Sequence, residues 1–278
     1  MKYKLICTDM DGTLLNDKHE ISEENKAALI EAHNKGICVA ITTGRLFTSA
    51  KAYSDLIGFN IPIIAANGAY IRLSDGDSCI FSSVFSHDEL LLIYKTLKQY
   101  DLPSIFYTYN TAISDTPLAD NHPYVIHNKS LPSDKQIHFC IGENINELLK
   151  KYDNEVSKVI CIENNPKKHD ILFKVKEILK STNLFEVVSS STNNFEIMKK
   201  GTSKGNAVKE LAKSLNINRD EIICFGDNEN DLSMIKYAGL GVAMGNASQL
   251  LKDNSDYITD TNTNSGVAKA IKKWCFEE

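Results

Sequence analysis

Short hydrophobic runs alternate with amphipathic stretches over the first 70 residues of the chain. Apolar runs at residues 5–7, 37–41 and 61–65 are typical of buried strands. Between the first two runs lies a helical pattern, with Ser22 fitting an N-cap and Gly36 a C-terminal stop. The order strand, helix, strand, helix, strand predicts βαβ units and a parallel sheet.

The C-terminal part of the chain returns to the same alternation. Ser203 fits the N-cap of a helix, and strand-like runs follow at residues 221–225 and 239–244. Apolar residues at helical spacing follow each of these runs. The two ends of the chain therefore predict two halves of one α/β sheet.

The middle of the chain, residues 83–198, breaks this rhythm. It begins with a helical pattern and continues with short strand-like runs, at residues 105–109, 112–114, 138–141, 159–162, 185–189 and 195–198. We predict an α/β fold with a doubly wound, Rossmann-like parallel sheet built from residues 1–82 and 199–278. Residues 83–198 form an inserted α+β domain in this prediction.

Composition narrows the class of protein. The chain has 278 residues, 42% hydrophobic and 24% charged, which is typical of a globular protein with room for two domains. No apolar run is long enough to span a bilayer, and the N-terminus lacks a signal-peptide pattern. A net charge of −5 and a pI near 5.8 weigh against nucleic acid or an acidic membrane as the main partner.

Seven cysteines are present, without a C-x-x-C pair, and most lie inside apolar runs. Buried free thiols in a reducing cytoplasm explain them better than disulfides or a zinc site. We therefore expect a cytoplasmic protein without a membrane or nucleic-acid partner.

Two carboxylates, Asp9 and Asp11, follow directly on the first strand-like run and precede Gly12. Ligands of open α/β sheets bind beyond the carboxyl ends of the strands, where both acids would lie. One carboxylate could attack phosphorus while the other handles protons. A plain Asp-Gly turn is the competing interpretation of these residues.

A second acidic cluster makes a catalytic interpretation more favourable. Asp227 ends the strand at residues 221–225, and Asp231 lies one turn into the next helical pattern, so both can reach the same sheet edge. Carboxylate oxygens suit octahedral magnesium. Acids at a helix N-terminus also interact favourably with the helix dipole. This alternative explains Glu229 well and the strand-end pair of aspartates less well.

Two further elements predict a phosphate site. Thr43, Gly44 and Arg45 end the second core strand and offer a hydroxyl, backbone N–H groups and a helix N-terminus. Lys204 lies in the first turn of the helix after Ser203, where a cation gains nothing from the helix dipole. This placement points to a specific anionic partner.

These four blocks, in this order, resemble the motifs of the haloacid dehalogenase superfamily. The matched patterns are D-x-D-G-T, a Thr before Gly-Arg, a Lys in Ser-Lys-Gly, and G-D-x-x-N-D. Further stretches at residues 67–69, 241–247 and 264–267 resemble its Cof-type subgroup. Members of that subgroup carry a large α/β cap (type IIB), and residues 83–198 would be that cap, which determines substrate specificity.

The resemblance implies a role for each matched residue. Asp9 would be the nucleophile that forms an aspartyl-phosphate. Asp11 would be the general acid for the leaving group and then the base for water. Thr43 and Lys204 would complete the catalytic set by holding phosphoryl oxygens.

The resemblance also implies a magnesium cofactor, Mg2+. Its ligands would be Asp9, the backbone carbonyl of Asp11, Asp227 and, from close by, Asp231. The residues implied near the substrate phosphate are Gly44, Arg45, Asn67, Gly68 and Asn230.

Asp11 separates the reactions found in the family. An alkoxide leaving group needs a proton donor and a halide does not, so a phosphoric monoester hydrolase acting on small phosphorylated metabolites is favoured, with sugar phosphates as the expected class. A phosphosugar mutase or other phosphotransferase, and a catalytically silent binding protein on the same fold, remain the alternatives. The glycine pattern at residues 239–245 lacks G-x-G-x-x-G spacing, so no nucleotide cofactor is expected.

Overall fold

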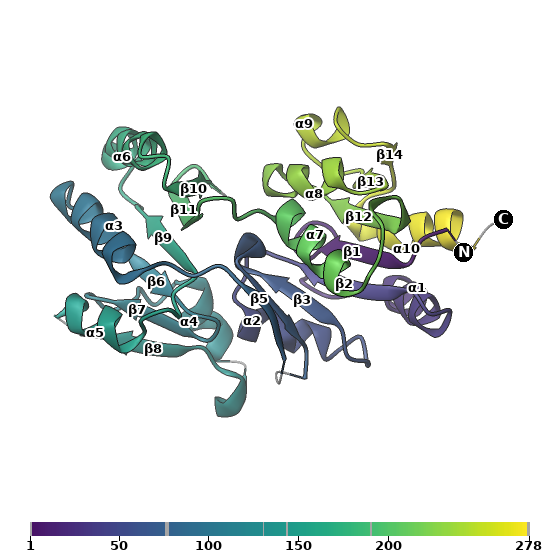
Figure 1. Cartoon of the computed structure of the whole chain (residues 1–278), viewed down its shortest axis with the longest axis horizontal. Coiled ribbons are helices and arrows are strands. Elements are labelled where there is room, and N and C mark those ends of the chain that lie inside the picture. Colours follow the sequence, from purple (N-terminus) through teal and green to yellow (C-terminus); the bar gives the residue numbers. More distant parts are fainter. Residues whose placement is uncertain (1, 76–77, 130, 143, 190, 277–278) are drawn as a thin grey trace. The chain divides into compact units, whose positions relative to one another are not determined.

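The computed structural model describes residues 2–75, 78–129, 131–142, 144–189 and 191–276. The chain divides into two compact units (Figure 1). Unit 1 consists of Met1–Arg45, Ala50–Phe81 and Ser203–Glu278, and unit 2 of Leu46–Ser49 and Ser82–Thr202. The assignment of residues 83–198 as a substrate-selecting cap stays a prediction.

Unit 1 is built on an eight-stranded sheet. Its strands lie in the order β14 (Tyr257–Ile258), β13 (Leu240–Ala243), β12 (Ile222–Gly226), β1 (Leu5–Asp9), β2 (Cys38–Thr42), β3 (Pro62–Ala65), β4 (Tyr70–Leu73) and β5 (Cys79–Ser82). Pairing is parallel from β14 to β3, and β4 runs antiparallel to β3. The predicted α/β fold with a parallel sheet is confirmed, while β4, β5 and β14 were not predicted.

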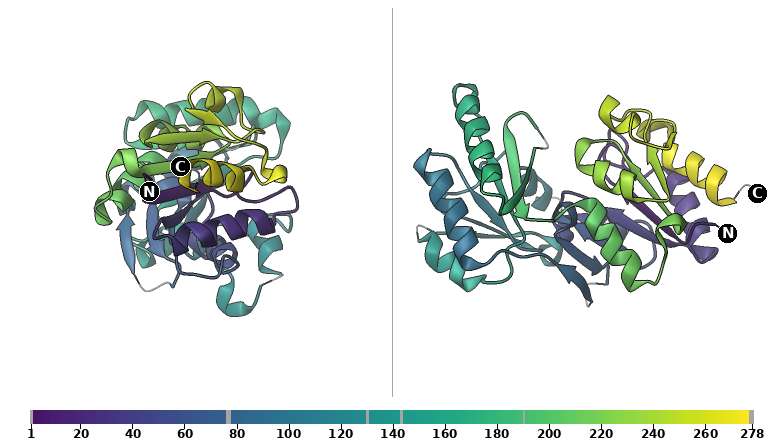
Figure 2. Two further views of the ribbon diagram at one scale, coloured as in Figure 1. Left: turned by 90° about the vertical axis from the view of Figure 1, so that its right-hand side faces the viewer. Right: turned by 45° about the horizontal axis from the view of Figure 1, so that its top comes forward.

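The helices that accompany this sheet are α1 (Glu23–Asn34), α2 (Phe47–Ser54), α7 (Lys204–Ser214), α8 (Leu232–Tyr237), α9 (Gln249–Lys252) and α10 (Gly266–Ile271). The connections β1–α1–β2 and β12–α8–β13 cross the sheet in opposite directions. Right-handed crossovers therefore place α1 and α8 on opposite faces. Helix α10 contacts α1, as Figure 2 also shows, and α7 contacts α8. Both faces of the sheet are covered.

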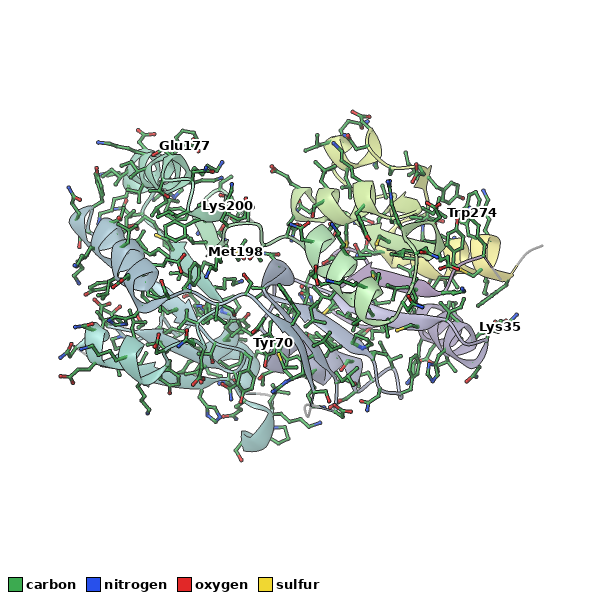
Figure 3. All side chains as sticks on the ribbon, viewed as in Figure 1. Lys35, Tyr70, Glu177, Met198, Lys200 and Trp274 are labelled. Carbon is green, nitrogen blue, oxygen red and sulfur yellow. The ribbon has the colours of Figure 1, made fainter. Side chains whose placement is uncertain are left out.

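Burial on both faces explains why the central strands appear as continuous apolar runs in the sequence. All five residues of β1 and all five of β12 are buried. Ser22 caps α1 as expected, with its hydroxyl accepting from the Asn25 N–H at 3.2 Å. Trp274 lies at the surface of unit 1 (Figure 3). Its ring meets the Tyr257 ring edge-on, with the ring centres 5.7 Å apart.

Unit 2 contains a six-stranded sheet in the order β10 (Phe185–Val188), β11 (Asn194–Lys199), β9 (Lys158–Ile162), β6 (Ile105–Tyr107), β7 (Thr111–Ser114) and β8 (His138–Ile141). Its pairs are antiparallel except β7 with β8. Its helices are α3 (His87–Gln99), α4 (Pro123–Asn128), α5 (Ile145–Lys151) and α6 (His169–Ser181). Helices α3, α5 and α6 pack on one sheet face and bury a single apolar cluster.

Two statements about the whole chain follow from the described residues. All seven cysteines carry free thiols, as the sequence predicted, but burial was predicted too broadly: Cys79 is exposed and Cys38 and Cys140 are half-buried. Within the described part of the chain, every helix is too short or too polar to cross a membrane.

A buried histidine joins α4 to the sheet of unit 2. The Nδ1 atom of His122 accepts the Tyr124 N–H at 3.2 Å, so the ring carries its proton on Nε2, which lies 3.1 Å from the Tyr107 hydroxyl. Burial, and then the nearby charge of Lys158, lower the pKa of His122 to about 4. A protonated ring could no longer accept the N–H that it caps.

We expect this histidine to destabilise the protein in acid. The unfolded chain binds a proton on His122 near its usual pKa of about 6.5, and the folded chain binds it only near about 4. The free energy of unfolding should therefore fall by up to about 3 kcal/mol between those pH values. In His122→Asn, an amide keeps the capping acceptor without titrating. Urea denaturation of both proteins across this range tests the idea, and equal pH slopes would contradict it.

Candidate functional site

The carboxyl ends of three parallel strands bring the predicted polar residues to one edge of unit 1. Asp9 is the last residue of β1, Thr43 directly follows β2, and Asp227 directly follows β12. Because β12, β1 and β2 are neighbours, these side chains meet although the sequence separates them widely. Lys204, the first residue of α7, completes the group.

The ammonium of Lys204 bridges two buried carboxylates. Its Nζ lies 2.6 Å from Asp9 Oδ1 and 2.5 Å from Asp231 Oδ1, and its side chain has 0% exposure. A buried charge is tolerated only when it is paired, and Lys204 has two anionic partners. This pairing explains why a lysine occupies a helix N-terminus. Burial lowers the pKa of Lys204, but the charges of Asp231 and Asp9 outweigh it and the net pKa is raised.

The second acidic pair is held in a fixed orientation. Oδ2 of Asp231 accepts the backbone N–H groups of Asp227 at 2.9 Å and Asn228 at 3.0 Å. The Thr13 hydroxyl donates to Asp227 Oδ1 at 3.0 Å. The turn after β12 therefore presents the carboxylate of Asp227 beside that of Asp9.

Three carboxylates could share a cation. Asp9, Asp227 and Asp231 each offer an oxygen, and these atoms lie within 4.8 Å of one another. Lys204 supplies one positive charge against three negative ones, which leaves room for a divalent ion. Oxygen donors of this kind suit Mg2+. Among the described residues Asp11 is not part of this cluster.

Electrostatics within the cluster favour a bound cation. Burial and the charge of Asp231 raise the pKa of Asp9 well above its usual value, although Lys204 offsets part of this rise. Burial and the charge of Asp231 raise the pKa of Asp227 to about 6. Crowding thus destabilises the carboxylate forms, and a cation between them would relieve the repulsion.

Hydrogen bonds join the segments after β2 and β3 beside the carboxylate cluster. The Thr43 hydroxyl accepts the Arg45 N–H at 3.1 Å, and the Thr43 carbonyl accepts the Asn67 N–H at 3.0 Å. Asn67 has a left-handed backbone with φ of 55°, and its Oδ1 accepts from Asn230 Nδ2 at 3.2 Å. The structure therefore brings Thr43, Asn67 and Asn230 together.

The two predicted glycines of this region lie against neighbouring groups. A Cβ on Gly44 would lie 3.0 Å from Asn67 Oδ1. A Cβ on Gly68, which has φ of 99°, would lie 2.3 Å from the carbonyl oxygen of Ser203. Gly68 thus lets the loop after β3 approach the start of α7. Contact of either glycine with a substrate stays a prediction.

Asp11 and Arg45 form an ion pair outside the carboxylate cluster. Arg45 Nε donates to Asp11 Oδ2 at 2.7 Å, and Nη2 donates to Oδ1 at 2.5 Å. Burial lowers the pKa of Arg45, but Asp11 outweighs this effect and the net pKa is raised. That Arg45 lies near the substrate stays a prediction, and in the structure its guanidinium contacts Asp11.

Three residues that the sequence did not assign to the site shape the loop after β1. A Cβ on Gly12, with φ of 79°, would lie 2.4 Å from Asp227 Oδ2. Asn246 Nδ2 donates to the Gly12 carbonyl at 2.8 Å, and Asn246 Oδ1 accepts the Asn262 N–H at 2.9 Å. Gly12 follows two acids and precedes a threonine, but its close approach to Asp227 has no signal in the local sequence.

Comparison with known proteins gives a family match over most of the chain. The model of haloacid dehalogenase-like hydrolases matches residues 6–271. The chain is also similar to the 5-amino-6-(5-phospho-D-ribitylamino)uracil phosphatase YcsE of Bacillus subtilis. The two are 35% identical over 274 residues, which is 98% of this chain and 95% of the relative.

Solved structures give the same result. A haloacid dehalogenase-like hydrolase from Bacteroides thetaiotaomicron is 29% identical, with a TM-score of 0.82, over 98% of this chain and 99% of that one. A protein described as a sugar phosphatase of haloacid dehalogenase subclass IIB is 25% identical, with a TM-score of 0.76, over 98% and 99% of the two chains. The similarity includes both units.

We expect Gly12→Ala to weaken binding of a divalent cation by about 10-fold or more, because the new Cβ would displace the Asp227 carboxylate. Gly36→Ala is the matched control, since Gly36 has φ of 84° and nothing within 4 Å of a built Cβ. Both variants should lose about 1 kcal/mol or more of stability. Calorimetric titration with Mg2+ measures the difference, and equal affinities would remove Asp227 from the proposed ion site.

Proposed function

The chain belongs to the haloacid dehalogenase-like hydrolases, and from that premise we propose that it hydrolyses small phosphate monoesters through a phosphorylated Asp9. One observation carries the proposal: Lys204 joins Asp9 to Asp231 in a buried group that also contains Asp227. Such a group places a nucleophile, Asp9, next to a positive charge, that of Lys204, which can compensate the charge of a phosphoryl group. Phosphoryl transfer depends mainly on those two properties.

The residues present fit a magnesium ion. Asp9, Asp227 and Asp231 would hold it, together with the backbone carbonyl of Asp11. When bound, the ion would neutralise charge on the transferring phosphoryl group. The fit rests on the all-oxygen donors, on the excess negative charge, and on the raised pKa values of Asp9 and Asp227.

Neighbouring groups would hold the phosphoryl oxygens. Lys204 can donate from its ammonium, and Thr43 can donate from its hydroxyl because the oxygen of that hydroxyl already accepts the Arg45 N–H. Asn230 and Asn67 lie beside them and add amide donors. Gly44 and Gly68 would also lie near the phosphate in this proposal.

In the first half-reaction an oxygen of Asp9 attacks phosphorus and the bond from phosphorus to the leaving oxygen breaks. The protonated carboxyl of Asp11 gives its proton to that oxygen, and the alcohol departs. In the second half-reaction the carboxylate of Asp11 takes a proton from water as the water attacks phosphorus. Asp9 is released, inorganic phosphate leaves, and Asp11 regains its proton.

We propose sugar phosphates and phosphorylated polyols as the substrate class, with unit 2 as the cap that selects among them. The B. subtilis relative is named for a phosphate carried on a ribityl chain, and the subclass IIB structure is described as a sugar phosphatase. A panel of phosphorylated metabolites, assayed for phosphate release, tests this class. Transfer of the phosphoryl group to a second sugar without phosphate release would favour a mutase instead.

Asp9→Asn should abolish turnover, with a loss of at least about 1,000-fold, because the amide is nearly isosteric but is no nucleophile. The change should leave circular dichroism and the fold intact. Hydrolysis of p-nitrophenyl phosphate measures the loss. Turnover close to that of the wild type would refute the assignment of the nucleophile.

Chelation should remove activity reversibly. EDTA is expected to stop hydrolysis, and added Mg2+ to restore it, because the carboxylate cluster lacks charge compensation without a cation. Ca2+ serves as the control, since its longer bonds and larger coordination number fit this chemistry less well. Full activity in EDTA would exclude a role for the ion.

A further inference from the structure

Arg45 is fixed on several sides within unit 1. Its backbone N–H donates to the Thr43 hydroxyl at 3.1 Å, and its carbonyl accepts the Ala66 N–H at 2.9 Å. The guanidinium carbon lies 4.8 Å from the centre of the Tyr53 ring, which is cation–π distance. A guanidinium held in this way presents its N–H groups as a rigid fork.

The side chain of Asp11, unlike that of Arg45, has few contacts that hold it in place. Its side chain is 44% exposed, and besides Arg45 its other ion-pair contact in the described chain is His19, whose Nδ1 lies 3.8 Å from Oδ1. The backbone around it is fixed, because the Leu15 N–H donates to the Met10 carbonyl at 2.9 Å. The direction of the carboxylate therefore depends mainly on Arg45.

We propose that Arg45 is the positioning residue for Asp11, and that it acts on catalysis through Asp11 rather than by binding the substrate phosphate. This inference rests on the proposed function. The two-point contact, at 2.7 Å and 2.5 Å, fixes the plane of the carboxyl group. If Nη2 releases Oδ1, Nε still holds Oδ2, and the freed oxygen can carry the proton to the leaving group.

The choice of leaving group separates the two possible roles of Arg45. An alkoxide must be protonated as it leaves, whereas p-nitrophenolate is stable without a proton. A residue that positions the acid therefore matters for the first half-reaction of sugar phosphates and little for that of p-nitrophenyl phosphate. The second half-reaction, in which Asp11 is the base, is common to both esters. The comparison therefore uses kcat/KM, which reports the steps up to phosphorylation of Asp9. A residue that binds the phosphate matters equally for both esters.

The test compares Arg45→Gln and Arg45→Lys with the wild type on p-nitrophenyl phosphate and on the best sugar phosphate of the panel. We expect kcat/KM for the sugar phosphate to fall by about 10-fold or more in both variants, and kcat/KM for the aryl ester by less than about 3-fold. Arg45→Lys keeps the charge but not the fork, and retained aryl turnover reports that each variant is folded.

Coupling to Asp11 completes the test. In an enzyme that already carries Asp11→Asn, adding Arg45→Gln should lower kcat/KM for the sugar phosphate by less than about 2-fold. The reason is that Arg45 acts through the carboxylate of Asp11, which this background lacks. Lys51→Gln is the control: Lys51 pairs with Asp55 at 3.0 Å on α2, the helix that carries Tyr53, and its loss should change neither ester.

Two kinds of failure can be told apart. Equal losses of kcat/KM on both esters, additive with the loss in Asp11→Asn, would overturn the positioning role and make Arg45 a phosphate ligand. The proposed function would survive that result if Asp9→Asn is inactive. If the wild type hydrolyses neither ester, the proposed function fails, and the inference fails with it.

Discussion

A single buried ammonium, that of Lys204, holds the site of unit 1 together. Asp9 and Asp231 are carboxylates with almost no access to water, and each depends on Lys204 for its opposite charge. Helix α7 can deliver this charge because it packs closely on α8: a Cβ on Gly205 would lie 2.4 Å from the Ser233 carbonyl oxygen. The packing of two helices thus decides where the charge is placed.

The charges of the sheet edge fall into two groups with separate compensation. Lys204 serves the carboxylates that we assign to the nucleophile and the ion, and Arg45 serves Asp11. Because each group has its own cation, the side chain of Asp11, to which we assign proton transfer, stays apart from the proposed ion site. Two carboxylates only two residues apart can therefore have different chemistry.

Much of the fold and of the candidate site could be predicted because buried parallel strands have apolar sequences. The polar residues that follow such strands lie at the same edge of the sheet. Asp9, Thr43 and Asp227 all follow such runs. Strands β4, β5 and β14 were missed because they are short and lie toward the edges of the sheet, where burial leaves a weaker pattern. The partner of Arg45 was missed because a bidentate contact depends on loop geometry that spacing does not encode.

The link from Gly12 through Asn246 to Asn262 has a consequence for biosynthesis. The loop after β1 leaves the ribosome long before Lys204, Asp227 and Asn262, which come much later in the sequence. While translation proceeds between these positions, the nascent chain carries Asp9 without the residues that hold it in the folded protein. The carboxylate group of the site can therefore assemble only after Asp231 has been translated.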